Sequence, residues 1–151
     1  MGLAILSPQL EDVTKTLNSV IRTILDANIS MSIQENAIST HGRIDLEIRK
    51  KYIEEEYLSM DLIPKDEQDR SNQPGLLEII YNEVNYYMIA GTADADCEHL
   101  IYDFSLSYLR LNPNHIISIY NQFFISLEII NEIETEKKYY NNWLKDLTQQ
   151  S

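Results

Sequence analysis

The chain has 151 residues, with 12 Lys and Arg against 24 Asp and Glu, and so carries a formal charge of −12. This length is enough for one domain with a core of its own, and the negative charge repels phosphate backbones and anionic membrane surfaces. We therefore expect a single domain over residues 1–151 that binds no nucleic acid; the charge permits, without requiring, a cationic or amphipathic protein segment as partner.

The first residues resemble no targeting signal. The apolar run Leu3–Leu6 is short and has no basic residue before it, unlike a signal peptide. No stretch approaches the roughly 18 apolar residues that a membrane span needs. The single cysteine, Cys97, cannot form an internal disulfide, which fits a reducing compartment. These features predict a soluble, cytoplasmic protein, and we expect residues 1–7 to be disordered.

Residues 8–27 are predicted to form an amphipathic helix. Ser7 can cap it, Pro8 suits its first position, and apolar residues then recur at three- and four-residue spacing as far as Leu25. In the residues that follow, 29–33, Ile, Met and Ile alternate with serines, which is typical of a strand.

Residues 43–62 admit two interpretations, and the fold class depends on the choice between them. As a helix, the segment would place Arg49 and Lys50 where its second apolar turn should lie. As two strands, 44–48 and 58–62 each alternate apolar with polar side chains and bury one face. We predict the two strands, although the residues between them lack the Gly, Asn or Pro of a tight hairpin turn.

The second half of the chain predicts a loop and further helices and strands. Residues 64–75 contain no apolar residue besides prolines and are expected to form a loop. A broad apolar stripe predicts a helix over 75–90, strict alternation predicts two strands over 93–109, and a long helix follows over 113–147, with a disordered tail at 148–151. The order α-β-β-β-α-β-β-α predicts an α+β fold, with an antiparallel sheet packed against helices.

The sequence lacks motifs for catalysis, metals and cofactors. The three histidines fall in different predicted elements, and Cys97 with His99 lacks the second pair of ligands that a zinc site needs. None of the four glycines falls in a phosphate-binding spacing. We therefore expect no metal, no cofactor and no enzymatic activity, because nothing supplies a matched acid, base or nucleophile.

Ten tyrosines are the unusual feature of the composition. Tyrosine is enriched in interfaces because its ring packs while its hydroxyl reaches water or a partner; the alternative is that these rings border an ordinary core. A helix over 75–90 that is apolar on nearly all sides is either central in its domain or shared with a second chain. Together these features favour a binding protein over an enzyme.

The acidic composition and the order of the elements resemble those of the class I type III secretion chaperones, dimers that escort bacterial effector proteins in the cytoplasm. Asn82, Asn85 and the Ala90-Gly91 pair stand where that family carries a Leu-Asn pattern and small residues. The resemblance covers nearly the whole chain.

The resemblance implies a homodimer that holds a partner's N-terminal segment in extended form and adds it as a strand to an exposed edge. The implied dimer interface lies in the predicted second helix and consists of Leu77, Ile80, Tyr81, Val84 and Met88. The implied client groove lies on the first helix and the strands and consists of Val13, Leu17, Val20, Met31, Ile44, Leu46 and Ile48. The alternative for each residue is a place in the ordinary core.

The competing function is that of an immunity protein that neutralises a basic toxin by charge complementarity. Its binding face would comprise Glu54–Glu56 and the acidic loop 66–69. The two functions differ in salt dependence, because added salt slows association with an acidic surface far more than it weakens apolar strand addition.

Overall fold

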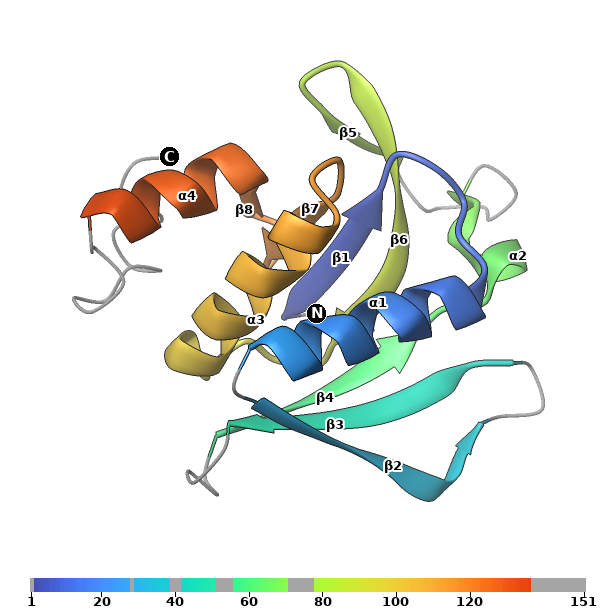
Figure 1. Ribbon diagram of the computed structural model, residues 1–151. Helices are drawn as coiled ribbons and strands as arrows, with labels where there is room; N and C mark the ends of the chain where they lie inside the picture. The colour runs from blue at the N-terminus through green and yellow to red at the C-terminus, as the bar shows by residue number, and fades with distance from the viewer. Residues whose placement is uncertain (1, 28, 39–41, 51–55, 71–77, 137–151) are drawn as a thin grey trace.

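The structure, a computed structural model, describes residues 2–27, 29–38, 42–50, 56–70 and 78–136. Within these residues are four helices and eight strands, which confirms the α+β fold class (Figure 1). In chain order they are β1 (Leu3–Ser7), α1 (Val13–Asp26), β2 (Ile29–Ile38), β3 (Ile44–Lys50), β4 (Tyr57–Leu62), α2 (Lys65–Gln68), β5 (Ile79–Tyr81), β6 (Val84–Thr92), α3 (Glu98–Leu111), β7 (Ile116–Ile119), β8 (Phe123–Ile125) and α4 (Leu127–Glu136). The order differs from the predicted one.

The first strand lies at the centre of the sheet. The strand order is β2-β3-β4-β6-β1-β7-β8, all antiparallel, and β5 pairs with β6 outside this path. Ile5 lies opposite Ala90 of β6 on one side and Ile117 of β7 on the other. The prediction of a disordered N-terminus is therefore wrong for residues 3–7, and residue 1 lies outside the described residues. Every residue of β1 is buried, as expected of a short apolar run that has neighbours on both sides.

Residues 43–62 contain two strands, as predicted. β3 and β4 pair along their length, with Leu46 opposite Met60. Their apolar side chains are buried, whereas Asp45 and its neighbours on the other face are exposed or half-buried. This is the one-sided burial that the alternation predicts. The connection at 51–55 lies outside the described residues.

The predicted helix over 75–90 is wrong. Its described part forms the β5–β6 hairpin, whose turn residues Asn82 and Glu83 have φ of 49° and 65°. A two-residue hairpin turn of type I′ needs positive φ at both positions. β6 changes from exposed at Val84 to buried at Ile89, because it runs from the protruding hairpin into the middle of the sheet. Because of this change, apolar residues occur on both faces of the strand in the sequence, and their spacing resembles that of an apolar helix.

The two strands predicted over 93–109 are also wrong, because α3 occupies most of this range. The aromatic residues that alternate with polar ones, Tyr102, Phe104 and Tyr108, are all buried. The helix contacts α1, α4 and β2, so its side chains are buried in several directions. Even Ser105 is buried. In α3, the alternation of apolar and polar residues in the sequence therefore does not correspond to an alternation of buried and exposed side chains.

The β7–β8 hairpin stands where the long helix over 113–147 is predicted. Ile117 lies opposite Ile125, and Tyr120 and Asn121 in the turn have positive φ. The β-branched isoleucines at the start of this range suit a strand better than a helix. Of the helix predicted over 113–147, the described residues form a helix only in α4, and residues 137–151 lie outside the described residues.

Two predicted boundaries shift. The first helix begins at Val13 and not at Pro8, because residues 8–12 cross from β1 to α1. The predicted loop over 64–75 contains the one-turn helix α2. The buried amide of Gln68 accepts a hydrogen bond from the Glu11 N–H at 2.9 Å and donates to the Glu11 carbonyl at 2.7 Å, so α2 fixes the crossing segment.

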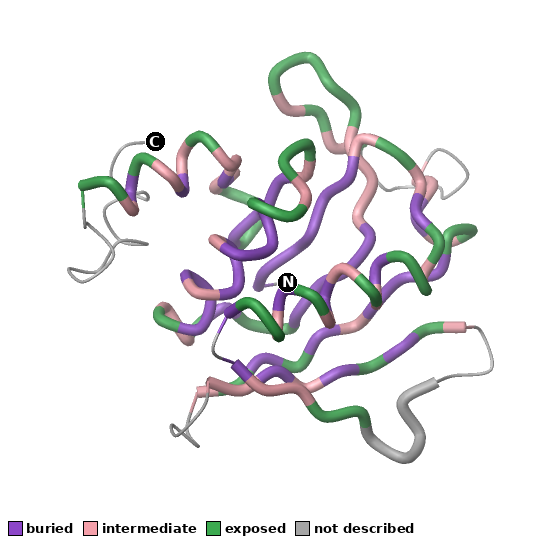
Figure 2. The backbone as a smooth tube through the Cα atoms, viewed as in Figure 1, coloured by how far each residue is buried: buried purple, intermediate pink, exposed green. Residues whose placement is uncertain are grey.

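The three longer helices, α1, α3 and α4, lie on one face of the sheet. α1 and α3 contact each other and cover the strands, and α4 packs on α3 (Figure 1). The main core lies between these helices and the sheet, where the buried stretches of both layers face each other (Figure 2). A smaller cluster lies apart from it. It consists of Ala4, Leu6 and Ile116, with Ile79, Tyr81, Tyr86, Met88 and Phe124 packed against them.

Gly2→Ala is expected to lower the free energy of unfolding by about 3 kcal/mol or more. The added methyl carbon would lie 2.0 Å from the Asp94 carbonyl carbon. The backbone of Gly2 is held in place, since its N–H donates to the Thr92 carbonyl at 2.9 Å and its carbonyl accepts from the Tyr120 N–H at 2.6 Å. Urea denaturation measures the loss.

Gly42→Ala is the matched control for this substitution. Its nearest neighbour would be 4.0 Å away, at the Pro64 side chain, and its φ is 80°. The control should therefore lose only the roughly 1–2 kcal/mol of a left-handed backbone conformation. Equal losses in the two variants would contradict the close packing at Gly2.

Candidate functional site

The residues of the predicted client groove divide into two groups. Those in the main core, at most 6% exposed, are Val20, Ile44, Leu46 and Ile48. Those that are partly buried at the border of the core are Val13, Leu17 and Met31. The first group is enclosed by the protein's own helices and strands and is not open to a partner. The second group leads to an apolar surface between α1 and β2.

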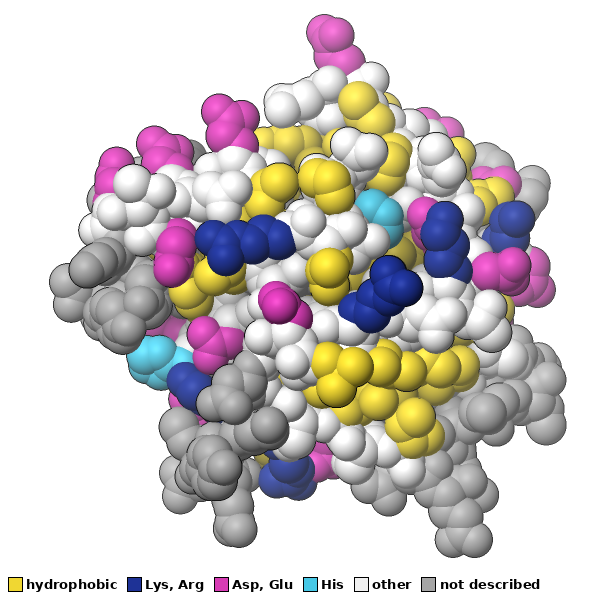
Figure 3. Space-filling model, viewed as in Figure 1, with side chains coloured by type: hydrophobic (Ala, Val, Ile, Leu, Met, Phe, Trp, Pro, Cys, Tyr) yellow, Lys and Arg dark blue, Asp and Glu magenta, His cyan; other side chains and the backbone are white. Residues whose placement is uncertain are grey.

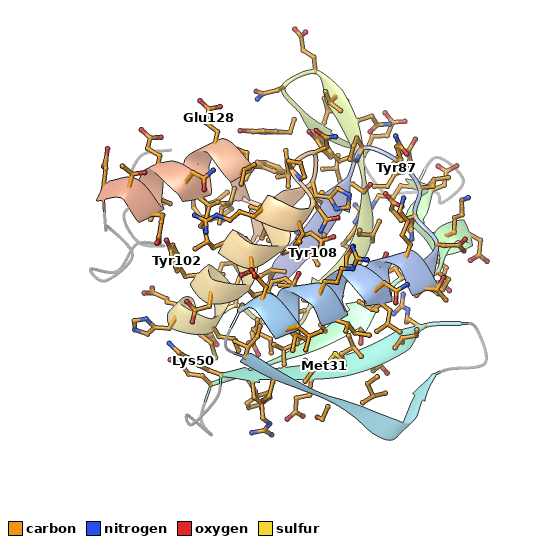
Figure 4. All side chains as sticks on the ribbon, viewed as in Figure 1. Met31, Lys50, Tyr87, Tyr102, Tyr108 and Glu128 are labelled. Atoms are coloured by element: carbon orange, nitrogen blue, oxygen red, sulfur yellow. The ribbon has the colours of Figure 1, made fainter. Side chains whose placement is uncertain are left out.

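We call this surface the apolar strip; it consists of Leu17, Ile21, Ile24 and Leu25 of α1 and Met31 and Ile33 of β2. Leu25 is 80% exposed and Ile33 is 49% exposed, and the others are partly buried. Figure 3 shows a continuous patch of hydrophobic side chains between α1 and the strands beside it. In Figure 4, Met31 points from β2 toward α1. A contiguous exposed apolar surface of this kind is typical of an interaction site.

The strip borders an edge of the sheet. β2 pairs with β3, from Ile29 opposite Lys50 to Ile33 opposite Leu46, and no other described strand lies on its outer side. An edge strand presents backbone N–H and C=O groups to which another extended chain can bind. Backbone groups and apolar side chains are therefore available together along β2.

The predicted dimer residues lie on the β5–β6 hairpin and its extension. Ile80 is 61% exposed and Val84 is 41% exposed. Tyr81 and Met88 pack on the smaller cluster. Leu77 lies outside the described residues. Ile80 and Val84 are thus the part of the predicted interface that is open to solvent.

A polar cluster at the start of α1 was not predicted. The Glu11 carboxylate lies 3.2 Å from Nζ of Lys15 and 3.7 Å from Nε2 of His115, and it accepts a hydrogen bond from the Ser7 hydroxyl at 3.2 Å. On the other side of the imidazole, Nδ1 of His115 lies 2.9 Å from the Tyr108 hydroxyl. The members come from distant parts of the chain, so no sequence spacing signals them.

This polar cluster has a structural role, because it connects distant segments of the chain. Burial lowers the pKa of His115, although the Glu11 carboxylate opposes the shift, and burial raises the pKa of Tyr108. Tyr108 is fully buried, and the adjoining cavity of about 80 Å³ has room for a few water molecules only. The cluster therefore joins the β1–α1 crossing to α3 and β7, and it offers no exposed nucleophile.

Two carboxylates meet on the outer face of the sheet. Asp45 and Asp61 are direct cross-strand partners. The hydrogen bond to Asp45 and burial raise the pKa of Asp61 to about 6, and Arg43 opposes the shift. The Asp61 carboxyl therefore binds a proton more tightly in the folded chain than in the unfolded chain. Protonation of Asp61 stabilises the folded chain at low pH, and this contribution is lost as the pH rises through about 6. The pair follows from strand register, which the sequence pattern does not display.

The predicted acidic toxin-binding face is not one open surface in the described residues. Glu54 and Glu55 lie outside them, and Glu56 is half-buried. In the acidic loop 66–69, Glu67 pairs with Arg43 at 3.1 Å. The acidic residues of the two segments are therefore partly used within the protein.

No metal site or membrane span is found in the part of the chain that the structure describes. No group of three or more His, Cys, Asp or Glu is placed to hold a metal ion. The Cys97 thiol instead lies 3.5 Å from the Tyr57 carbonyl oxygen. None of the described helices is both long and apolar enough to cross a bilayer.

Comparison with known proteins finds no family model, curated protein or solved structure that matches this chain. The resemblance to the class I type III secretion chaperones depended on the order α-β-β-β-α-β-β-α, which is not the order observed. The geometry of the apolar strip and of the β2 edge is therefore the main basis for assigning a function.

On acidification from about pH 7.5 to about pH 5, the parent is expected to lose free energy of unfolding relative to His115→Asn. The opposite contribution of Asp61 is common to both proteins and cancels in this difference. Burial holds the pKa of His115 below its ordinary value of 6.5, so the unfolded chain binds more protons in this range. Proton uptake at His115 therefore favours unfolding. Urea denaturation at both pH values measures the effect.

His99→Asn is the control, because His99 is an exposed residue of α3 outside the cluster. It should keep the pH dependence of the parent protein. A His115→Asn variant with the same pH dependence as the parent would contradict this role of the buried imidazole.

Proposed function

We propose that this protein binds an extended segment of another protein along the edge of β2 and holds it there as an added strand. The observation that carries the proposal is the apolar strip beside an edge strand. In the finer form expected from the sequence, the partner is the N-terminal segment of a secreted effector and the protein acts in the cytoplasm. The single cysteine, which cannot form an internal disulfide, supports that location.

The bound segment would gain backbone hydrogen bonds from β2 and cover the strip. Side chains of a strand alternate between two faces, so every second side chain would pack near Met31 and Ile33. Apolar burial contributes about 25 cal/mol per Å², while ordering the segment costs roughly 1–2 kcal/mol per residue. The affinity therefore depends on how well a few apolar side chains fit the strip.

Ile33→Asp is expected to weaken binding of an extended apolar peptide by at least about tenfold. The carboxylate removes apolar area and places a charge where an added strand would pack. The probe is a fluorescein-labelled peptide in which valine alternates with threonine, and fluorescence anisotropy with the full chain measures the affinity. Amide hydrogen exchange should slow in residues 29–33 when the peptide binds.

Leu111→Asp is the matched control, because Leu111 is 44% exposed at the end of α3 and lies outside the strip. It should bind the peptide as the parent does. Equal weakening in both variants, or unchanged exchange in β2, would argue against strand addition.

A homodimer is the second part of the proposal, and it is supported by the exposed Ile80 on the β5 strand of the hairpin. Light scattering behind size-exclusion chromatography should give twice 17.6 kDa for the parent. Ile80→Asp should give a folded monomer, because a carboxylate would be desolvated in the interface, and Leu111→Asp should remain dimeric. A monomeric parent would remove this part of the proposal and leave strand addition unaffected.

A further inference from the structure

A second groove lies between the β5–β6 hairpin and the first turns of α4. Its volume is about 660 Å³, and none of the residues of the apolar strip lines it. In Figure 3, hydrophobic side chains gather between the hairpin and the helices at the top of the view. The side chains that define its chemistry are Tyr81, Val84, Tyr86, Leu127, Glu128 and Glu132.

Two carboxylates stand on the α4 side of this groove. Glu128 and Glu132 are one helical turn apart, both are exposed, and neither forms an ion pair with a described lysine or arginine. Figure 4 shows Glu128 projecting outward from α4. The helix dipole favours a carboxylate in the first turn, where Glu128 lies, but a second like charge one turn later weakens the helix. A bound cation would balance both charges.

The hairpin side of the groove carries two tyrosines and a valine beside Asn82, and Asn114 and His115 also line the groove. Tyr81 and Tyr86 pack on the smaller core cluster, and Tyr81 stacks on Phe124 with ring centroids 4.9 Å apart. Val84 stands beside them, 41% exposed. Among the described residues that line the groove there is no lysine or arginine. Rings and aliphatic side chains opposite carboxylates suit a cation carried on an apolar stem.

We propose that this groove binds a protein segment in which an arginine or lysine is flanked by apolar side chains. Charge complementarity selects this occupant, because the charged side chains at the groove are Glu128 and Glu132 and the whole chain carries −12. Arginine suits the groove better than lysine, because its planar guanidinium can bond a carboxylate with two N–H groups and stack on a tyrosine ring. The site is separate from the β2 edge.

The test measures the fluorescence anisotropy of a labelled peptide in which arginine alternates with leucine, titrated with the full chain. The double variant Glu128→Gln/Glu132→Gln should bind it at least about tenfold more weakly than the parent. Glutamine preserves the size and polarity of these exposed side chains, so the fold is retained. Added to Ile33→Asp, in which strand addition is weakened, the same two glutamine substitutions should cause the same fold-loss, which separates the groove from strand addition.

Asp26→Asn/Asp66→Asn removes the same charge from exposed positions outside the groove and should leave the affinity within about twofold of the parent. Three results would overturn the proposal. They are no binding by the parent, an equal loss in this control, or a dimeric parent that Glu128→Gln/Glu132→Gln separates into monomers. The last result would place a second copy of the chain in the groove.

Discussion

The structure depends on β1 lying between β6 and β7. Without this strand, the sheet would separate into β2-β3-β4-β6 on one side and the β7–β8 hairpin on the other. Leu3 and Ile5 enter the main core, whereas Leu6 enters the smaller cluster, so one strand serves both apolar clusters. Gly2 extends the close fit, because an added methyl group would overlap the Asp94 backbone.

The sequence predicts the fold correctly where burial is one-sided. Ile44, Leu46 and Ile48 alternate with charged residues because β3 has one buried face and one wet face. β6 and α3 lack this contrast: β6 passes from solvent into the sheet, and α3 is buried in several directions. Hydrophobic periodicity then no longer distinguishes helix from strand. In β5–β6 it is the positive φ of Asn82 and Glu83 that allows the tight turn of a hairpin.

The candidate site was predictable only in part. Leu17 and Met31 carry an apolar signal in the sequence, but so does the buried Val20, and only tertiary packing shows which side of α1 faces β2. The groove beneath the hairpin is harder to predict still. The tyrosines of the groove belong to a segment whose sequence pattern indicates a helix. Glu128 lies at the same groove only because the β7–β8 hairpin reverses the chain before α4.

The central position of β1 also affects how the chain folds during synthesis. The Leu3 N–H donates a hydrogen bond to the hydroxyl of Thr92, 89 positions further along the chain. Ile5 pairs with Ile117, which is more distant still in sequence. β1 is synthesised before β6 and β7 and cannot pair until both are available, so the sheet closes late and folding is dominated by long-range contacts. In that interval the segment LAIL is an unpaired apolar strand, and a nascent-chain chaperone is the expected safeguard against its aggregation.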